Sequence, residues 1–412
     1  MRILQVSHRN YIAGGSDAVF LATCRLLREA GHEVIPFCID LPENRPSRWS
    51  AHFPKAADTA RAPLRDGLRY FYNREARIRL ERLLEQAGPL DVAHLHIYHG
   101  KQTPAILSPL RRRGIPVVHT LHEYKLACPV YTLERAGRPC EACVSGSALN
   151  CLRYRCKDGS LLRSAVMLAE MASARLLGDV RLVDRFICVS DFQRRLMARA
   201  GLPAEKLRRL HNFLPEPAGA APAGHDGYYL YFGRIEALKG IETLLDAFAD
   251  GRRRLVIAGD GSWSARLRAR IAGQPWVDYR GFQGGGALRR LIGRARAVIL
   301  PSEWYENCPM SLIEAKALGR PVIGADIGGI PELVRDGIDG ALFAPGDPFA
   351  LRRAMERLEA AGHEALSEAA FADAAARFGP QRHLAALMGI YAEAGARTRP
   401  LPARAPARVG AG

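Results

Sequence analysis

Short apolar runs alternate along the chain with longer segments in which apolar residues recur at helical spacing. The runs have the length of strands and lack polar alternation, which is typical of parallel strands in a sheet covered by helices on both faces. In the first half of the chain we expect strands at residues 3–7, 33–39, 92–98, 117–121 and 186–190, with helical spacing at 18–30 and 70–86. This alternation predicts a doubly wound α/β domain.

The same pattern begins again after the stretch PEPAGAAPAGHDG, whose Pro, Gly and Ala content is typical of an exposed linker. Six further strands are expected at residues 228–232, 254–258, 276–279, 297–300, 321–325 and 340–343. We therefore predict two Rossmann-like α/β domains in tandem. Their expected bounds are 1–212 for the first domain, 213–227 for the linker, 228–375 for the second domain, 376–396 for a C-terminal helix that crosses back to the first domain, and 397–412 for a disordered tail.

Composition and charge narrow the class of protein. A length of 412 residues excludes a single small module, and a hydrophobic fraction of 48% excludes global disorder. No apolar run reaches the roughly 18 residues of a spanning helix, and the first residues lack the apolar core of a signal peptide, so we expect a cytoplasmic protein. The net charge is +17, and residues 1–210 hold 34 Lys and Arg against 20 Asp and Glu, so an anionic partner is expected for this half.

The most informative segment is PSEWYENCPMSLIEAKALGRPVIGADIGGIPELV, residues 301–334, which follows an expected strand. Pro309 favours the first turn of a helix that runs to Gly319. The loop 306–309 then presents free backbone N–H groups at the positive end of a helix, an arrangement that binds anions at the carboxyl edge of a parallel sheet. Glu306 lies in this loop and Glu314 about one and a half turns into the helix, where carboxylates can bind sugar or ribose hydroxyls.

This segment resembles the signature of the retaining family 4 glycosyltransferases of the GT-B fold, also described as glycosyl transferases group 1. The signature is a strand, then P-S-x-x-E-x7-E-A-x-A-x-G-x-P-V, a glycine-containing turn and P-E. The chain differs in one respect, because three residues instead of two separate Ser302 from Glu306. The matching residues are Pro301, Ser302, Glu306, Glu314, Ala315, Ala317, Gly319, Pro321, Val322, Gly328, Gly329, Pro331 and Glu332.

The resemblance implies two Rossmann-like domains that face a cleft, with the nucleotide-sugar donor bound by the second domain. It further implies that Glu306 positions the sugar and that Glu314 binds the ribose. The loop and helix start between them would supply further donor contacts, from Asn307, Cys308, Pro309, Met310 and Ser311.

A second group of candidates follows the expected strand 228–232. Gly233 lets the backbone turn, and Arg234 and Lys239 then reach the edge of the sheet, where two cations suit a diphosphate. The alternative is a pair of ordinary surface cations, although lysine is scarce in this chain. In the resembled family a matching Arg and Lys neutralise the departing diphosphate. The resemblance also implies donor contacts from Gly233, Gly259, Gly261 and Phe282, the last in the turn that follows Arg280.

The first half of the chain holds fewer candidates for donor-binding or catalytic residues. Gly14 and Gly15 follow the first strand but do not complete a G-x-G-x-x-G fingerprint, and in the resembled family a matching pair closes over the sugar nucleotide. His122 matches the T-x-H-[DE] position of that family, which implies a catalytic role, whereas a lone His is otherwise often structural. Ser190 and Asp191 match the end of a later strand of the family.

Residues 122–156 hold five cysteines. Cys140, Cys143, Cys151 and Cys156 have spacings compatible with a structural zinc site, and Cys128 lies just upstream. A redox cluster and simple packing of thiols are the alternatives. A subset of the resembled family carries a similar Cys-rich insertion, which corresponds to residues 128–156 here.

The leading prediction is a retaining enzyme that moves a sugar from a UDP- or GDP-sugar to a glycan or lipid-linked glycan, in the synthesis of cell-surface polysaccharide or lipopolysaccharide. No cofactor is required for catalysis, because cationic side chains would take the place of Mg²⁺. The alternatives are a sugar-nucleotide epimerase of the same fold and a zinc-containing nucleic-acid-binding protein, although no nucleic acid is expected as a partner. The basic first half and the apolar face of residues 161–177 indicate peripheral contact with the cytoplasmic face of an anionic membrane, with packing on the domain as the alternative.

Overall fold

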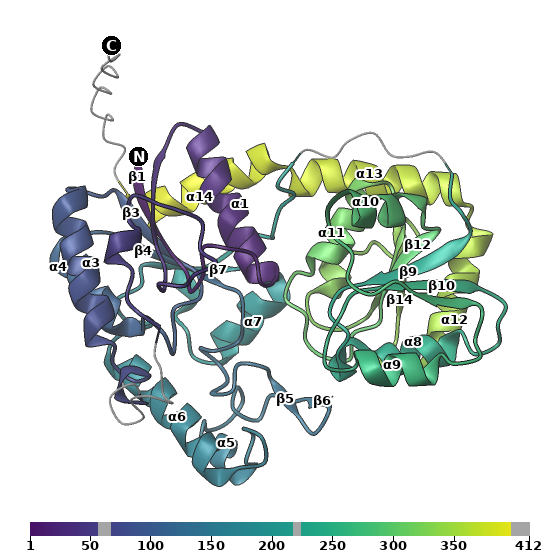
Figure 1. Cartoon of the computed structure of the whole chain (residues 1–412), viewed down its shortest axis with the longest axis horizontal. Helices are drawn as coiled ribbons and strands as arrows, with labels where there is room; N and C mark the ends of the chain where they lie inside the picture. Colours follow the sequence, from purple (N-terminus) through teal and green to yellow (C-terminus); the bar gives the residue numbers. More distant parts are fainter. Residues whose placement is uncertain (57–66, 217–223, 397–412) are drawn as a thin grey trace. The chain divides into compact units, whose positions relative to one another are not determined.

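The computed structural model describes residues 1–56, 67–216 and 224–396 (Figure 1). The chain divides into two compact units. Unit 1 holds Met1–Thr120, Ser173–Phe186 and the stretch that begins at Met388, and unit 2 holds Leu121–Ala172 and Ile187–Leu387. The expected tail and residues 217–223 of the expected linker lie outside the described residues, and in the described part of that linker Phe213 and Leu214 are buried.

The first sheet has six strands in the order β2-β1-β3-β4-β7-β8. Strand β1 pairs in parallel with β2 and β3, and β3 pairs in parallel with β4. The bounds are β1 Arg2–Val6, β2 Glu33–Phe37, β3 Val92–Leu95, β4 Val117–Leu121, β7 Arg185–Cys188 and β8 Leu207–Arg209. The five expected strands are confirmed, but several end earlier than the apolar runs do because burial continues into the turns, as at His96 and Tyr98. The short strand β8 was not expected.

Helices accompany these strands. They are α1 Gly15–Glu29, α3 Arg74–Ala87, α4 Leu107–Arg112, α5 Asn150–Arg153, α6 Leu161–Leu176 and α7 Asp191–Arg199. Helix α3 begins at residue 74, later than the periodicity suggested, because the Asn73 side chain caps it by accepting a hydrogen bond from the Ala76 N–H at 2.9 Å. Between α4 and α5 a small antiparallel pair forms from β5 Glu134–Arg135 and β6 Arg138–Pro139.

The second sheet has six parallel strands in the order β11-β10-β9-β12-β13-β14. The bounds are β9 Tyr228–Phe232, β10 Arg254–Ala258, β11 Val277–Tyr279, β12 Ala297–Leu300, β13 Val322–Ala325 and β14 Gly340–Phe343. The chain leaves β9 toward β10 on one side, and β12 returns to the other side of β9. The turns that follow β9 and β12 therefore lie at the topological switch point, where α/β sheets bind ligands.

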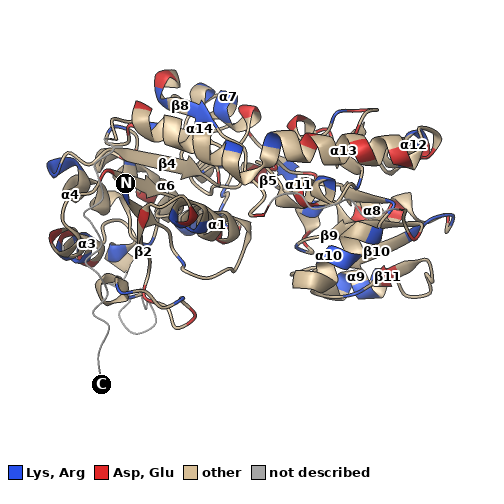
Figure 2. Ribbon diagram, turned by 90° about the horizontal axis from the view of Figure 1, so that it is seen from above, with Lys and Arg blue, Asp and Glu red and all other residues tan. Residues whose placement is uncertain are grey.

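Helices cover both faces of the second sheet. In Figure 1, α8 Ile241–Ala247 and α9 Ser264–Arg270 lie on one side of the strands, and α10 Gly285–Arg294 and α11 Met310–Ala317 lie on the other. Helix α12 Pro348–Ala360 packs against α8, and α13 His363–Phe378 packs against α11. Figure 2 shows Lys and Arg gathered over α9 and α10, and Asp and Glu along α13.

The expected C-terminal helix at 376–396 corresponds to α14 Pro380–Glu393, which is separated from α13 by a break at Gly379. The Tyr391 hydroxyl lies 2.8 Å from Nδ1 of His94 and accepts a hydrogen bond from the Gln5 amide at 3.3 Å, all within unit 1. In the described ranges, no helix has both the length and the apolar character that crossing a bilayer requires.

Candidate active site

Glu306 and Lys239 form an ion pair at the switch point of the second sheet. Lys239 Nζ lies 2.5 Å from Glu306 Oε1, which also accepts hydrogen bonds from Ser302 Oγ at 2.8 Å and from Trp304 Nε1 at 2.9 Å. Burial acts to raise the pKa of Glu306, but Lys239 and these hydrogen bonds outweigh it and hold the pKa below its usual value. The carboxylate is therefore ionised, and in the described part of the chain no residue bonds its second oxygen, Oε2.

Gly240 allows the backbone next to Lys239 to pack closely on the loop that carries Glu306. Gly240, next to Lys239, has φ +70° and packs so closely on the start of the 301–309 loop that an added Cβ would lie 1.8 Å from the Pro301 carbonyl oxygen. A side chain at this position is excluded both by its backbone conformation and by that contact. Sequence reasoning did not single out Gly240, although its place between a candidate cation and a helix was visible.

Helix α11 begins at Met310, one residue later than expected, and Pro309 is its N-cap in an extended conformation. No side chain within the described ranges caps this end, so its N–H groups are available to a ligand. Glu314 lies about one turn into the helix. Burial raises the pKa of Glu314 to about 7, and no hydrogen bond or ion pair with a described residue offsets that burial.

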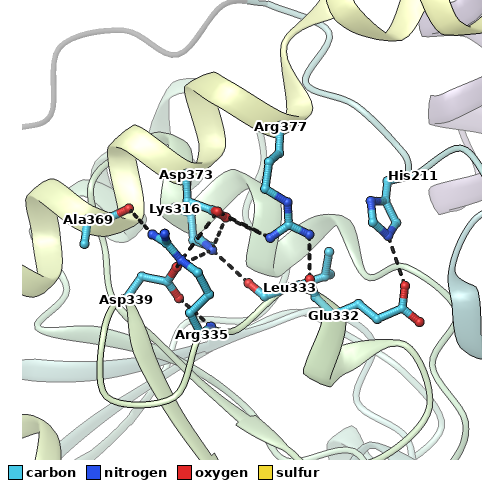
Figure 3. Close-up of polar contacts among 9 residues, drawn as sticks. All are labelled: His211, Lys316, Glu332, Leu333, Arg335, Asp339, Ala369, Asp373 and Arg377. Atoms are coloured by element: carbon cyan, nitrogen blue, oxygen red, sulfur yellow. Dashed lines mark hydrogen bonds and ion pairs between the residues drawn. The ribbon is translucent and has the colours of Figure 1, made fainter.

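Lys316 anchors α11 two residues beyond Glu314. Its fully buried ammonium lies 3.0 Å from Asp339 Oδ2 and 2.5 Å from Asp373 Oδ2, and it donates to the Leu333 carbonyl at 2.8 Å (Figure 3). Its three donors therefore have three acceptors. Arg335 and Arg377 also reach Asp373, so the helix that carries Glu314 is tied to α13 through a buried charge network.

Glu332 joins this network to α7. Its carboxylate accepts the backbone N–H groups of Asp191 at 2.7 Å and Phe192 at 2.6 Å. It also lies 3.1 Å from His211 Nε2 (Figure 3). Burial would raise the pKa of Glu332, but the hydrogen bonds from His211 and from these amides lower it below its usual value. Ser190 caps the same helix by accepting from the Gln193 N–H at 3.1 Å. Ser190 and Asp191 thus have structural partners.

The loop between the two acidic residues contacts the segment around His122. Asn307 Nδ2 donates to the His122 carbonyl at 2.9 Å, and the buried Oδ1 of Asn307 has no partner in the part of the chain that the structure describes. Burial lowers the pKa of His122 to about 4, so its ring is neutral at physiological pH. Burial raises the pKa of Cys308 to about 12, and the Cys308 carbonyl accepts from Asn212. Cys308 is therefore an unreactive thiol.

The predicted glycines differ in their surroundings. An added Cβ at Gly259 would lie 1.8 Å from the Gly233 carbonyl oxygen, and one at Gly261 would lie 2.3 Å from that of Ile235, so close backbone packing requires these two glycines. Gly14 is the N-cap of α1 in unit 1, and a Cβ at Gly15 would meet nothing within 4 Å. Packing inside the unit therefore does not explain Gly15.

The two remaining predicted donor residues are exposed to solvent. Arg234 follows β9 and has no described ion-pair partner. Phe282 follows Gly281 after β11 and is 79% exposed, an unusual fraction for a Phe in a packed domain. Both side chains are free to meet a ligand.

The cysteines of residues 128–156 are free thiols, like the other four in the chain. Within residues 1–56, 67–216 and 224–396, no three His, Cys, Asp or Glu side chains converge closely enough to hold a metal ion. Burial raises the pKa of Cys143 and of Cys151 to about 12. The zinc site at Cys140, Cys143, Cys151 and Cys156 stays a prediction.

Comparisons with known proteins agree with this geometry. Residues 13–215 match the family model "Glycosyltransferase Family 4", and residues 227–360 match "Glycosyl transferases group 1". An alpha-D-kanosaminyltransferase of Streptomyces kanamyceticus is 30% identical over 240 residues, or 52% of this chain and 62% of that protein. An O-antigen chain mannosyltransferase B of Escherichia coli is 28% identical over 228 residues, or 50% of this chain and 57% of that protein. The chain thus matches less than two thirds of the length of these relatives.

Solved structures extend the likeness in fold over nearly the whole chain. The lipopolysaccharide outer core galactosyltransferase WaaB superposes with a TM-score of 0.65 at 15% identity, covering 95% of this chain and 99% of that one. Anabaena Alr3699/HepE in complex with UDP gives a TM-score of 0.63 at 18% identity, covering 95% and 100%.

Two six-stranded Rossmann-like sheets with these neighbours define a protein of the GT-B fold, as the sequence predicted. Since family models cover both halves, the chain belongs to the family 4 glycosyltransferases of group 1.

Proposed function

We propose that the chain transfers a sugar from a nucleoside-diphosphate donor to a glycan or lipid-linked glycan, with retention of anomeric configuration, in the synthesis of cell-surface polysaccharide or lipopolysaccharide. The observation that carries the proposal is Glu306, whose Oε1 is held by Lys239, Ser302 and Trp304 beside the uncapped start of α11. Relatives named for O-antigen and lipopolysaccharide transfer support the substrate class.

Different residues of the site bind different parts of the donor. The N–H groups at the start of α11, together with Arg234 and Lys239, neutralise the diphosphate. Glu306 Oε2 accepts a hydrogen bond from a sugar hydroxyl, and Glu314 accepts from the ribose once its carboxyl is ionised. Neutral His122 can accept as well as donate a hydrogen bond, so it orients the sugar or the acceptor without adding charge.

Transfer then proceeds on one face of the sugar. The bond from C1 to the β-phosphate oxygen breaks while the acceptor oxygen bonds C1 from the same face, and the acceptor proton passes to the departing phosphate oxygen. The cations and amides stabilise the charge that develops on that oxygen, so no further cofactor is required.

A thermal-shift titration with UDP and GDP tests the donor site. One nucleotide at 100 times its Kd should stabilise the wild type by about 2.7 kcal/mol. Glu314→Ala should lose most of that gain, and Glu364→Ala, which alters an exposed position on α13, should keep it. Equal shifts in all three proteins, or none in the wild type, would overturn the assignment of the donor site.

Product analysis tests the reaction. With the nucleotide sugar that binds, the glycosylated acceptor should carry the anomeric configuration of the donor, as read from its NMR coupling constant. An inverted product would contradict retention, and an epimerised nucleotide sugar formed without acceptor consumption would contradict transfer.

The proposed lipid-linked acceptor places the protein at the cytoplasmic face of an anionic membrane. Helix α6 exposes Leu161, Leu162 and Val166 at 55%, 75% and 38%, with the exposed Arg163 among them, a combination that binds anionic interfaces. Cosedimentation with phosphatidylglycerol vesicles should be lost in Leu162→Glu and kept in Leu68→Glu, which changes a leucine with 69% exposure elsewhere. Equal binding of both variants would refute this contact.

A further inference from the structure

The first sheet has a topological switch point of its own, at the carboxyl ends of β1 and β3. The chain leaves β1 toward β2 on one side, and β3 returns to the other side of β1. Sheets of this kind bind ligands outside the strand ends at such a point. In the proposed function the donor is bound by residues of unit 2, so the switch point of unit 1 has no ligand assigned to it.

The turn after β3 is tied to the turn after β1 by two hydrogen bonds. His8 Nε2 donates to the His99 carbonyl at 3.1 Å, and Gln102 Nε2 donates to the Ser7 carbonyl at 2.6 Å. The second bond fixes the Gln102 amide, because only its nitrogen can donate to a carbonyl oxygen. Gln102 is fully buried, and its Oε1 has no hydrogen-bond partner in the described part of the chain. The turn therefore lacks a donor that a ligand hydroxyl can supply.

A buried carboxylate faces the His99 ring from another part of unit 1. Asp179 Oδ2 lies 3.5 Å from His99 Nε2, and Asp179 Oδ1 pairs with Arg175 at 3.4 Å. The ring also stacks on Tyr98, with ring centroids 4.2 Å apart. The carboxylate favours the tautomer with the proton on Nε2, which leaves Nδ1 as a hydrogen-bond acceptor. Among the described residues none donates to Nδ1, and an imidazole oriented by a carboxylate is an arrangement that active sites use.

Thr103, at the end of the same turn, has a strained backbone. It is a β-branched residue with φ +59° and ψ +166°, a region that only glycine adopts readily. The Thr103 N–H donates to the Tyr98 carbonyl at 2.9 Å, and its Oγ1 accepts from the Asn73 N–H at 3.0 Å. Strain of this kind clusters at binding sites, and here it fixes the path of the turn that carries His99 and Gln102.

We propose that His99, oriented by Asp179, is an acceptor-binding residue whose Nδ1 accepts a hydrogen bond from a hydroxyl group of the acceptor glycan. The inference rests on the proposed function, which supplies a glycan as the second substrate. Because the groups that bind the donor belong to unit 2, loss of this bond weakens the use of the acceptor and leaves nucleotide binding unchanged.

The kinetic test compares His99→Gln with His52→Gln, with octyl glucoside, octyl galactoside and octyl mannoside as acceptors. Glutamine keeps an amide that can reach Asp179 but has no group in the place of Nδ1, so a purely structural His99 would tolerate the change. The control is a histidine of the same unit, whose Nε2 lies 2.6 Å from Gln86 Oε1. His99→Gln should lower kcat/KM for the acceptor about tenfold. The Kd of the free nucleotide and the rate at which water hydrolyses the nucleotide sugar should stay unchanged.

A second measurement does not depend on transfer. In protein labelled with ¹⁵N-histidine, the ring signal that is missing from His99→Gln belongs to His99. The octyl glycosides should shift this signal in the wild type and in Asp184→Asn, and should shift it less in Asp179→Asn. The control is matched because Asp184 is also paired with an arginine of unit 1, Arg111, at 2.9 Å.

Each result separates the acceptor contact from the donor site. A wild-type His99 signal that none of the three glycosides shifts would overturn the inference, as would a His99→Gln variant that transfers as well as His52→Gln. A loss of hydrolysis equal to the loss of transfer would also overturn it, because the effect would then not be on the acceptor. A wild type that binds no nucleotide and forms no glycosylated product, with the His99 signal shifted as expected, would overturn the proposed function alone.

Discussion

The titration of Glu314 gives the sharpest physical prediction. Its pKa is raised to about 7 from an ordinary value of 4.5, and the cause is burial without a described partner. Between these two pH values the folded state holds a proton that the unfolded state has lost. The stability contributed at this position therefore falls as the pH rises through the window, and the loss is complete above pH 7.

The magnitude follows from the shift. About 2.5 pKa units correspond to a cost of about 3 kcal/mol for the ionised carboxylate, of which about 2 to 3 kcal/mol should appear between pH 5 and pH 8. Glu314→Gln keeps the shape and removes the titration. Urea unfolding of both proteins at pH 5, 6, 7 and 8 should therefore show Glu314→Gln gaining on the wild type by that amount as the pH rises.

All other titrating groups are common to both proteins and cancel in the difference. If the two free energies of unfolding change in parallel across this range, Glu314 titrates near its ordinary value. The argument from burial would then be refuted, and with it the expectation that ribose binding releases a proton from this side chain.

Three further predictions follow from the structure. Lys316→Met should lower the free energy of unfolding in urea by about 3 kcal/mol, because two buried carboxylates lose their ammonium partner. The control Arg353→Met, at an exposed position, should lower it by under about 1 kcal/mol, and equal losses in the two variants would contradict the network. Gly240→Ala should lower the Tm far more than Gly362→Ala, which has a similar positive φ but open space, and a smaller effect would refute the close contact with Pro301. If Cys140, Cys143, Cys151 and Cys156 bind zinc, elemental analysis should find about one zinc per chain in the wild type and none in Cys143→Ser. A wild-type protein that contains no zinc after purification without chelators would contradict the zinc prediction.

The sequence predicted the fold well because the pattern of buried strands depends on local runs. The strands at 228–232 and 340–343 have the bounds that their apolar residues predicted, and both sheets have the expected parallel character. The short strand β8 was missed because two of its three residues are Arg, which gives no apolar run. The start of α11 shifted by one residue because Pro309 caps the helix instead of entering it.

The sequence predicted only those site residues that short, continuous motifs of the chain contain. Glu306 and Glu314 could be found by their spacing, and Lys239 by its place after a strand. The partners of Lys316 lie 23 and 57 residues away along the chain, and nothing in a helical pattern distinguishes a buried Lys from a solvated one. The contact between Asn307 and His122 likewise joins distant segments, so only the folded chain reveals it.

The division of the chain into units has a consequence for its synthesis. Gln5 and His94 are buried in unit 1, and both are hydrogen-bonded to Tyr391, which the ribosome makes after the whole of unit 2. Residues 1–120 therefore cannot make this contact until all of unit 2 has been translated. The Tyr391 contact is thus a late step in the folding of unit 1 during synthesis.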